Sequence, residues 1–139
     1  MAKTIHVDIV SAEGEIFAGD AEMVFVPAQE GELGITPRHA PLLTLLKAGE
    51  VRVKTVEGEQ SIFVSGGALE VQPTAVTILA DTAVRAHDLD EVSALAAKQR
   101  AEEALADKSD KIDVARARME LLQAAAQLQL IEKIRKTRG

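Results

Sequence analysis

Hydrophobic and polar residues alternate in several short segments of the first half of the chain. In residues 4–10, Ile5, Val7 and Ile9 occupy every second position, which is the period of a strand that buries one face. A short apolar run ends before Pro27, a residue that is expected to end a strand. The pattern therefore predicts further strands at residues 23–26, 50–56 and 61–65.

Turn residues between these segments predict how the strands connect. Residues 57–59 include a glycine and separate the last two strands, which are expected to pair as a hairpin. A Gly-Gly turn at residues 66–67 follows, and Pro73 then separates two more strands, at residues 67–72 and 74–80. Short strands at this spacing predict a sandwich or barrel.

The second half of the chain has the longer period of amphipathic helices. Asp88 and Glu91 are spaced like the members of a capping box, with Asp88 as the N-cap. Residues 107–110 interrupt the pattern, and a second helix is expected from about Asp113 to Arg135. The short connection predicts an antiparallel helical hairpin. The apolar stripes are Ala94, Ala97, Ala101 and Leu105, and then Val114, Ala117, Leu121, Ala124, Leu128 and Ile131.

Composition and charge change near His87. Residues 1–88 contain all four prolines, all three phenylalanines and eight of the nine glycines, whereas residues 89–139 contain eleven alanines. The first part has six Lys and Arg against thirteen Asp and Glu, a net charge of −7, and the second has ten against nine, a net charge of +1. We therefore expect two domains, residues 1–86 and 87–139.

The alanine-lined stripes bear on how firmly the helices are held. Alanine allows two helices to approach closely, but it adds little apolar burial, because each buried methyl group contributes only about 0.8 kcal/mol. We interpret the hairpin as able to leave the β domain. A permanently docked hairpin is the alternative, and periodicity alone does not separate the two.

The reactive residue types do not assemble into a catalytic or metal-binding pattern. The chain has no Cys, so a disulfide or a thiolate metal site is excluded. His6, His39 and His87 lie far apart with no ligand spacing, and neither a phosphate-binding glycine motif nor a nucleophile elbow occurs. A net charge of −6 and only three aromatic residues argue against nucleic-acid binding. We expect no metal, no cofactor, no signal peptide and no membrane-spanning segment.

One segment carries a resemblance to a known family. Residues 31–49 read GELGITPRHAPLLTLLKAG, which closely resembles the pattern G-x-L-G-I-x-P-x-H-A-P-L-x-T-x-L-x-x-G of the epsilon subunits of bacterial ATP synthases. The resemblance extends over essentially the full length. The other matching segments are residues 7–13, 64–71, 79–83 and 88–91.

The resemblance implies an α+β fold, with an N-terminal antiparallel β-sandwich of about ten strands followed by a C-terminal antiparallel helical hairpin. It implies a central-stalk rotor subunit that couples proton flow to ATP synthesis and inhibits ATP hydrolysis through its helices. The implied partners are the γ subunit, the c-subunit ring and the catalytic α and β subunits. The chain would be non-catalytic and peripheral, at the cytoplasmic face of the bacterial plasma (inner) membrane, and it would reach the membrane only through the complex.

Two groups of contact residues follow from the resemblance. An acidic loop would touch the c ring, with Gly31 and Gly34 allowing a tight turn; an ordinary acidic turn is the alternative. Basic residues of the helices would face an acidic segment of the β subunit, or would simply be solvated. The candidates are Glu30, Gly31, Glu32, Leu33 and His39 for the ring, with a structural role favoured for His39, and Lys108, Lys111, Arg116 and Arg118 for the β subunit.

A third group bears on nucleotide. Some family members bind ATP through a pattern [IL]-D-x-x-R-A-x-x-A-x-x-R-A, and Leu89, Asp90 and Arg100 fit it here, but Ser93 replaces the first arginine. Phosphate recognition relies on charge-assisted arginine contacts, so we expect binding to be severely weakened. An ATP-sensing module whose hairpin closes over nucleotide remains the alternative function, and an enzyme with an unrecognised site is a third.

Overall fold

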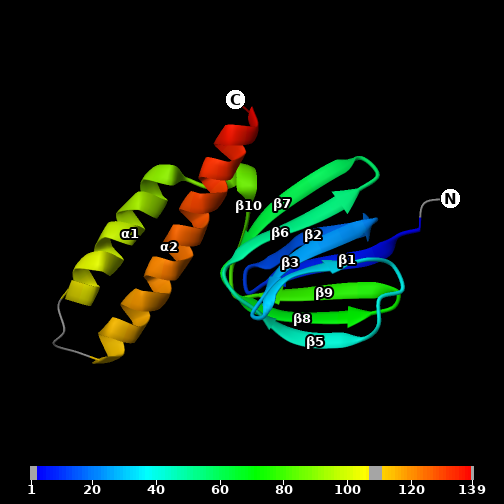
Figure 1. The fold of residues 1–139 in the computed structure, drawn as a ribbon, viewed down its shortest axis with the longest axis horizontal. Helices are drawn as coiled ribbons and strands as arrows, with labels where there is room; N and C mark the ends of the chain where they lie inside the picture. Colours follow the sequence, from blue (N-terminus) through cyan, green and yellow to red (C-terminus); the bar gives the residue numbers. More distant parts are fainter. Residues whose placement is uncertain (1–2, 107–110, 139) are drawn as a thin grey trace. The chain divides into compact units, whose positions relative to one another are not determined.

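The computed structural model describes residues 3–106 and 111–138, and the chain divides into two compact units between Ala86 and His87. Within these described residues the chain has ten strands followed by two helices, and Figure 1 shows that the strands and the helices form separate parts of the fold. The expected α+β fold is therefore confirmed. The strands are β1 Ile5–Ser11, β2 Gly14–Ala21, β3 Met23–Ala28, β4 Gly31–Ile35, β5 Leu42–Leu46, β6 Gly49–Thr55, β7 Gly58–Val64, β8 Gly67–Gln72, β9 Ala75–Ala80 and β10 Ala83–Arg85.

The strands form one sheet that folds over into a sandwich. Their order is β10-β7-β6-β3-β5-β8-β9-β1-β2, with β4 paired to the side of β3. All pairings are antiparallel except that of β1 with β9. The two edges meet, because β2 contacts β6 and β10 and the Arg85 guanidinium of β10 donates to the Ile16 carbonyl of β2 at 2.9 Å.

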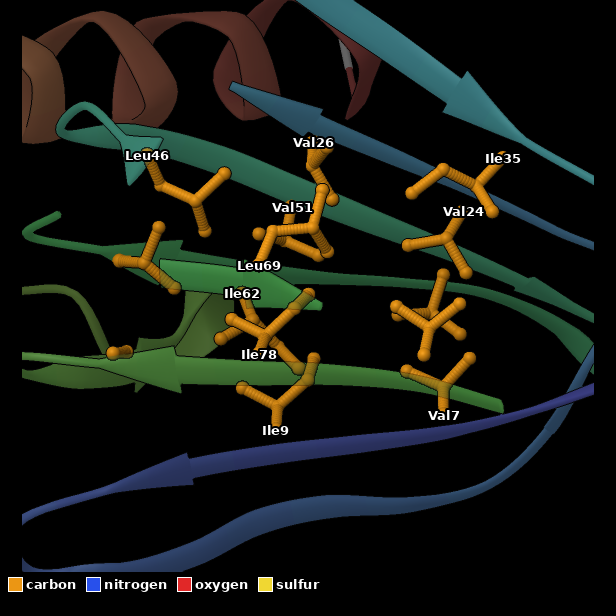
Figure 2. Packing of buried hydrophobic residues seen from close by; sticks show 14 of the residues in the cluster. Val7, Ile9, Val24, Val26, Ile35, Leu46, Val51, Ile62, Leu69 and Ile78 are labelled. Atoms are coloured by element: carbon orange, nitrogen blue, oxygen red, sulfur yellow. The ribbon is translucent and has the colours of Figure 1, made fainter. Parts of the chain in front are cut away.

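Alternate residues of the strands fill the space between the two layers. The buried positions include Ile5, Val7 and Ile9 on β1, as the alternation predicted. β-Branched residues dominate this core because they fit the pleated surface of a strand. Figure 2 shows the packing of Val7, Ile9, Val24, Val26, Ile35, Leu46, Val51, Ile62, Leu69 and Ile78.

The prediction that Pro27 ends its strand is wrong, because β3 continues to Ala28. The carbonyl of Pro27 accepts a hydrogen bond from the Lys47 amide at 2.9 Å, so the Pro27 nitrogen faces the same side of β3. The ladder with β6 on that side ends at Phe25. The missing N–H of proline therefore removes no bond of that ladder.

Four strands were not predicted, namely β2, β4, β5 and β10. β2 is an edge strand with only one fully buried residue, Ala21, and β10 has only three residues, so neither has a strong period-2 pattern. β4 carries two glycines within five residues, and β5 reads LLTLL. Glycines suggested a turn and the continuous apolar run did not alternate, but strand pairing overrides both signals.

A 3₁₀ turn at Ala86–Asp88 crosses the boundary between the units, and the second unit contains helices α1, Glu91–Ala106, and α2, Lys111–Arg138. α2 is longer at both ends than the expected span. The deeply buried residues are Ala94 and Ala101 on α1 and Ala117, Ala124 and Leu130 on α2. The alanines recur at intervals of seven, which is the spacing of a close antiparallel seam, and Leu130 was not among the predicted stripe residues.

The N-cap of α1 is Asp90 and not Asp88, so the capping-box prediction is wrong in register. The Asp90 carboxylate accepts hydrogen bonds from the Val92 amide at 3.0 Å and the Ser93 hydroxyl at 2.8 Å. The Ala94 amide donates to the Asp90 carbonyl at 3.0 Å. Asp90 therefore satisfies donors of the first helical turn, as an N-cap residue does.

Candidate functional site

Four of the five candidate ring-contact residues, Glu30, Gly31, Glu32 and Leu33, lie on a β-hairpin and not in a free loop. Gln29 and Glu30 form the turn between β3 and β4, and β4 begins at Gly31. Gly31 has φ +134°, which favours glycine, so it allows this tight turn. The Gln29 amide donates to the Leu45 carbonyl at 3.1 Å, which fixes the turn against β5.

The side chains of this hairpin differ in their exposure to solvent. Glu30 and Glu32 are exposed, whereas Leu33 packs against the hydrophobic core of the sandwich. Leu33 is therefore held by internal packing, whereas the side chains of Glu30 and Glu32 reach the surface. We call Gln29–Glu32 the docking turn below.

Gly34 has a different role from the one the sequence suggested. Its φ is not positive, so it does not make the turn. A Cβ at this position would lie 2.8 Å from Met23 Cε and 3.4 Å from Phe25 Cε1. Gly34 therefore leaves room for the side chains of Met23 and Phe25, which lie over β4 there, and the flexible end of Met23 can shift.

Arg52 on β6 links the docking turn to the neighbouring strands. Its Nη2 lies 2.9 Å from Glu32 Oε1, its Nη1 lies 3.7 Å from Glu59 Oε1, and its Nε lies 3.9 Å from Glu50 Oε1. The guanidinium carbon also lies 4.2 Å from the centroid of the Phe25 ring, within range of a cation–π interaction. No local sequence pattern identifies Arg52, because its pairing with Glu32 follows only from strand register.

His39 lies away from the docking turn. β4 has five residues, so at about 3.3 Å per residue its two ends are about 15 Å apart, and His39 follows the end remote from Glu30. His39 Nδ1 hydrogen-bonds to the Ala40 carbonyl at 2.7 Å, and the Arg38 amide donates to the Pro73 carbonyl at 2.9 Å. His39 and the docking turn therefore do not form one surface, and a ring contact of His39 stays a separate prediction.

The other histidines are held by carboxylates. His6 Nδ1 lies 3.3 Å from Asp20 Oδ1 and Nε2 lies 3.2 Å from Asp8 Oδ1. The hydrogen bond to Asp20 raises the pKa of His6 above its ordinary value, and Asp8 adds to the rise. His87 Nε2 lies 3.4 Å from Asp88 Oδ1. These pairs are at the surface and show no arrangement of a nucleophile with a base.

The basic candidates on the helices are only partly described. Arg116 and Arg118 are exposed, and they flank the buried Ala117 of α2. Lys108 lies outside the described residues, and so does the side chain of Lys111. The two arginines are therefore on the solvent side of the seam, where a partner can reach them.

The degenerate nucleotide motif is built into the helix cap. Ser93 donates its hydroxyl to Asp90, and this bond is the main cause that lowers the pKa of Asp90, with the backbone amides of Ser93 and Val92 adding to it. Leu89 is half-buried and Arg100 is exposed. Arg100 is ten residues from Asp90, which is about 15 Å along a helix. The structure brings Asp90 and Ser93 together, but not Arg100.

Within the part of the chain that the structure describes, no group of three His, Asp or Glu residues could hold a metal ion. No described helix is both long enough and apolar enough to span a membrane.

Comparison with protein families covers both units. A family model described as the β-sandwich domain of the ATP synthase delta/epsilon chain matches residues 4–86, and one described as the long α-helix domain of the same chain matches residues 87–132. The chain is 63% identical, over 140 aligned positions and the whole of both chains, to the ATP synthase epsilon chain of Nitrosococcus oceani. It is 61% identical over 141 positions to ATP synthase epsilon chain 1 of Methylococcus capsulatus, again over the whole of both chains.

Solved structures share the fold at lower identity. A chain of the Euglena gracilis mitochondrial ATP synthase, in a structure of OSCP, F1 and the c-ring, matches with a TM-score of 0.71 at 19% identity, covering 98% of this chain and 82% of that one. A chain of the Tetrahymena thermophila mitochondrial ATP synthase central stalk and c-ring matches with a TM-score of 0.58 at 14% identity, covering 95% and 96%. Together with the family models, these matches confirm the resemblance seen in the sequence.

Proposed function

Because this chain belongs to the delta/epsilon-chain family of ATP synthases, we propose that it is the epsilon subunit in the central stalk of a bacterial proton-transporting ATP synthase. The observation that carries the proposal is the full-length match at 63% identity, which includes sandwich and hairpin together. In this role the chain turns with the rotor, couples proton flow to ATP synthesis and restrains ATP hydrolysis. Synthesis and hydrolysis take place on other subunits, and this chain is non-catalytic.

The sandwich is the coupling unit, which binds the γ subunit and the c-subunit ring. The docking turn supplies the ring contact, since its Glu30 and Glu32 are exposed while the neighbouring Leu33 is half-buried against the core. A glycine-dependent turn fixed to β5 presents these carboxylates on a rigid element, which lowers the entropy lost on binding. Basic side chains on the polar loops of the ring are the complementary groups.

The helical hairpin is the inhibitory unit. α2 has 28 residues, so it is about 42 Å long at 1.5 Å per residue, enough to reach from the stalk into the catalytic head. The exposed Arg116 and Arg118 would meet acidic groups of the β subunit there. The alanine seam allows α1 and α2 to pack closely through small side chains, which suits a hairpin that keeps its own packing while it moves between two positions.

Nucleotide sensing is the less favoured function. Ser93 has no guanidinium to offer a phosphate, and its hydroxyl is already donated to Asp90. Arg100 lies about two to three helical turns away from Asp90 and Ser93. In our account the chain senses the state of the complex through its protein partners and not through ATP.

The chain acts at the cytoplasmic face of the bacterial inner membrane and is held there by its partners. This follows from the proposed role in the rotor, whose ring lies in the membrane.

The ring contact can be tested with a charge reversal in the docking turn. We expect Glu30→Lys to weaken rebinding of the chain to membranes that contain the synthase without this subunit, and to lower ATP-driven proton pumping. Glu57→Lys is the matched control, because Glu57 is also an exposed acidic residue in a hairpin turn, between β6 and β7. If Glu30→Lys rebinds and pumps as the unchanged chain does, the docking turn is not the ring contact.

A further inference from the structure

Glu32 is not a free carboxylate, although it is one of the two exposed acidic groups of the docking turn. Arg52 Nη2 lies 2.9 Å from Glu32 Oε1. Arg52 belongs to β6, which does not pair with β4 directly, because β3 lies between β4 and β6. The ion pair therefore spans β3 on the outer face of the sheet. A contact of this kind fixes the position of the Glu32 side chain relative to the rest of the sandwich.

The surroundings of Arg52 restrict its own position. The guanidinium lies over the Phe25 ring, and Phe25 lies against Gly34, where a Cβ would be within 3.4 Å of the ring. The Arg52 side chain is 27% exposed, compared with 60% for Glu32. Arg52 is thus a restrained cation, stacked on an aromatic ring, that pairs with a more exposed carboxylate.

Three carboxylates lie near the Arg52 guanidinium. Those of Glu32, Glu50 and Glu59 are each within 4 Å of one of its nitrogens. Glu50 also accepts a hydrogen bond from the Ser61 hydroxyl, which holds it within the sheet. Of the three carboxylates, Glu32 is the most exposed, and it lies nearest in sequence to the turn.

We propose that Arg52 is a positioning residue for docking: it holds the Glu32 carboxylate in the orientation in which a basic side chain of the ring meets it. The proposal rests on the ring contact assigned above to the docking turn. With Oε1 fixed by Arg52, Oε2 of Glu32 remains as an oriented acceptor. Without Arg52, the Glu32 side chain would have to be ordered at the moment of binding, at an entropic cost.

Removing Arg52 has two opposing effects on docking, and the distance over which each effect acts decides which one dominates. Loss of a cation makes the surface more negative and increases long-range attraction to a basic partner. That attraction is screened beyond about 8 Å at physiological ionic strength, whereas the loss of orientation acts at contact. At 0.15 M salt we therefore expect weaker docking, through faster dissociation.

The test is a double-mutant cycle on the full-length chain, measured as its dissociation constant for membranes bearing the synthase depleted of this subunit. We expect Glu32→Gln and Arg52→Gln each to weaken binding about five- to tenfold, and the double variant to be no weaker than either, because both remove the same oriented carboxylate. Lys54→Gln is the control for charge alone: Lys54 is an exposed cation on the same strand, two residues further along, and we expect less than a twofold change.

The outcomes separate this inference from the ring contact itself. If Glu32→Gln binds normally, Glu32 does not take part in the contact. If Glu32→Gln weakens binding while Arg52→Gln does not, or if the two effects multiply in the double variant, Arg52 does not act through Glu32 and the positioning role is rejected. Thermal unfolding of each variant checks that the sandwich is intact. If Arg52→Gln unfolds, the cycle is repeated with Arg52→Lys, which keeps the charge but loses the planar fork, and a smaller coupling of the same sign is expected.

Discussion

Two glycines with nearly the same backbone conformation offer a test of how tightly the sandwich is packed. Gly67 has φ +146° and Gly58 has φ +145°, a region that side chains rarely adopt. A Cβ at Gly67 would lie 2.1 Å from the Leu79 carbonyl oxygen and 2.9 Å from Ala80 Cα, whereas a Cβ at Gly58 would meet nothing within 4 Å. Replacement by alanine therefore adds conformational strain at both positions but a backbone clash only at Gly67.

The expected magnitudes follow from these two terms. Strain at such a φ costs about 1–3 kcal/mol, and we expect this alone for Gly58→Ala. The clash at Gly67 cannot be relieved by a flexible side chain, so β8 and β9 must separate, which adds about 1–3 kcal/mol. We expect Gly67→Ala to lose about 1–3 kcal/mol more than Gly58→Ala in the free energy of unfolding, which is the clash term alone.

The assay is urea unfolding of the two variants, followed by the circular dichroism of the strands. Gly67 is also opposite Leu46 on β5, and the neighbouring Leu45 carbonyl accepts the hydrogen bond from Gln29 of the docking turn. Gly67→Ala should therefore also speed amide exchange at Gln29, while Gly58→Ala should not. Equal losses of stability in the two variants would show that the close approach of Gly67 to Leu79 is absent, and the reasoning would fail.

Three further predictions concern protonation and nucleotide. Asp20 and Asp8 raise the folded-state pKa of His6. The stabilisation that protonated His6 gives the fold is therefore fully present below the unfolded-state pKa and is lost as pH rises through the folded-state pKa. The free energies of unfolding of the unchanged chain and of His6→Gln should differ at pH 5.5 and converge by pH 8.5. The folded-state pKa of Asp90 is lowered, so the stabilisation that its carboxylate gives the N-terminus of α1 should be lost as pH falls through that pKa. Asp90→Ala should speed amide exchange in the first turn of α1 at pH 7, and Asp90→Ser should not. The unchanged chain should show no heat of ATP binding at millimolar concentration, and Ser93→Arg should restore binding only in part; a micromolar dissociation constant for the unchanged chain would contradict this.

The sequence was informative where burial leaves a periodic pattern. The alternation around Ile5, Val7 and Ile9 predicted β1, and the turns around Gly58 and Pro73 predicted two hairpins that the structure contains. The alanine period predicted two helices and most of their seam. Composition changes near His87, and the structure divides after Ala86.

The sequence was uninformative where structure depends on pairing between distant segments. Glu32 and Arg52 are twenty residues apart, and their contact requires β3 to pair with β4 on one side and β6 on the other, which no local pattern specifies. The role of Gly34 is set by Phe25 and Met23 crossing β4. The register of the α1 cap was missed because Asp88 and Asp90 both suit an N-cap, and only the hydrogen bonds of the folded chain distinguish them.

The central claim is that the sandwich couples and the helices inhibit, and one measurement tests it most directly. Synthase membranes depleted of this subunit are reconstituted either with the full-length chain or with residues 1–85, which retain all ten strands and the core of the sandwich. ATP hydrolysis and proton-driven ATP synthesis are then measured on both. We predict that the shortened chain supports synthesis and gives faster hydrolysis than the full-length chain. Equal rates of hydrolysis would show that the helices are not the inhibitory element, and loss of synthesis would show that the sandwich alone does not couple.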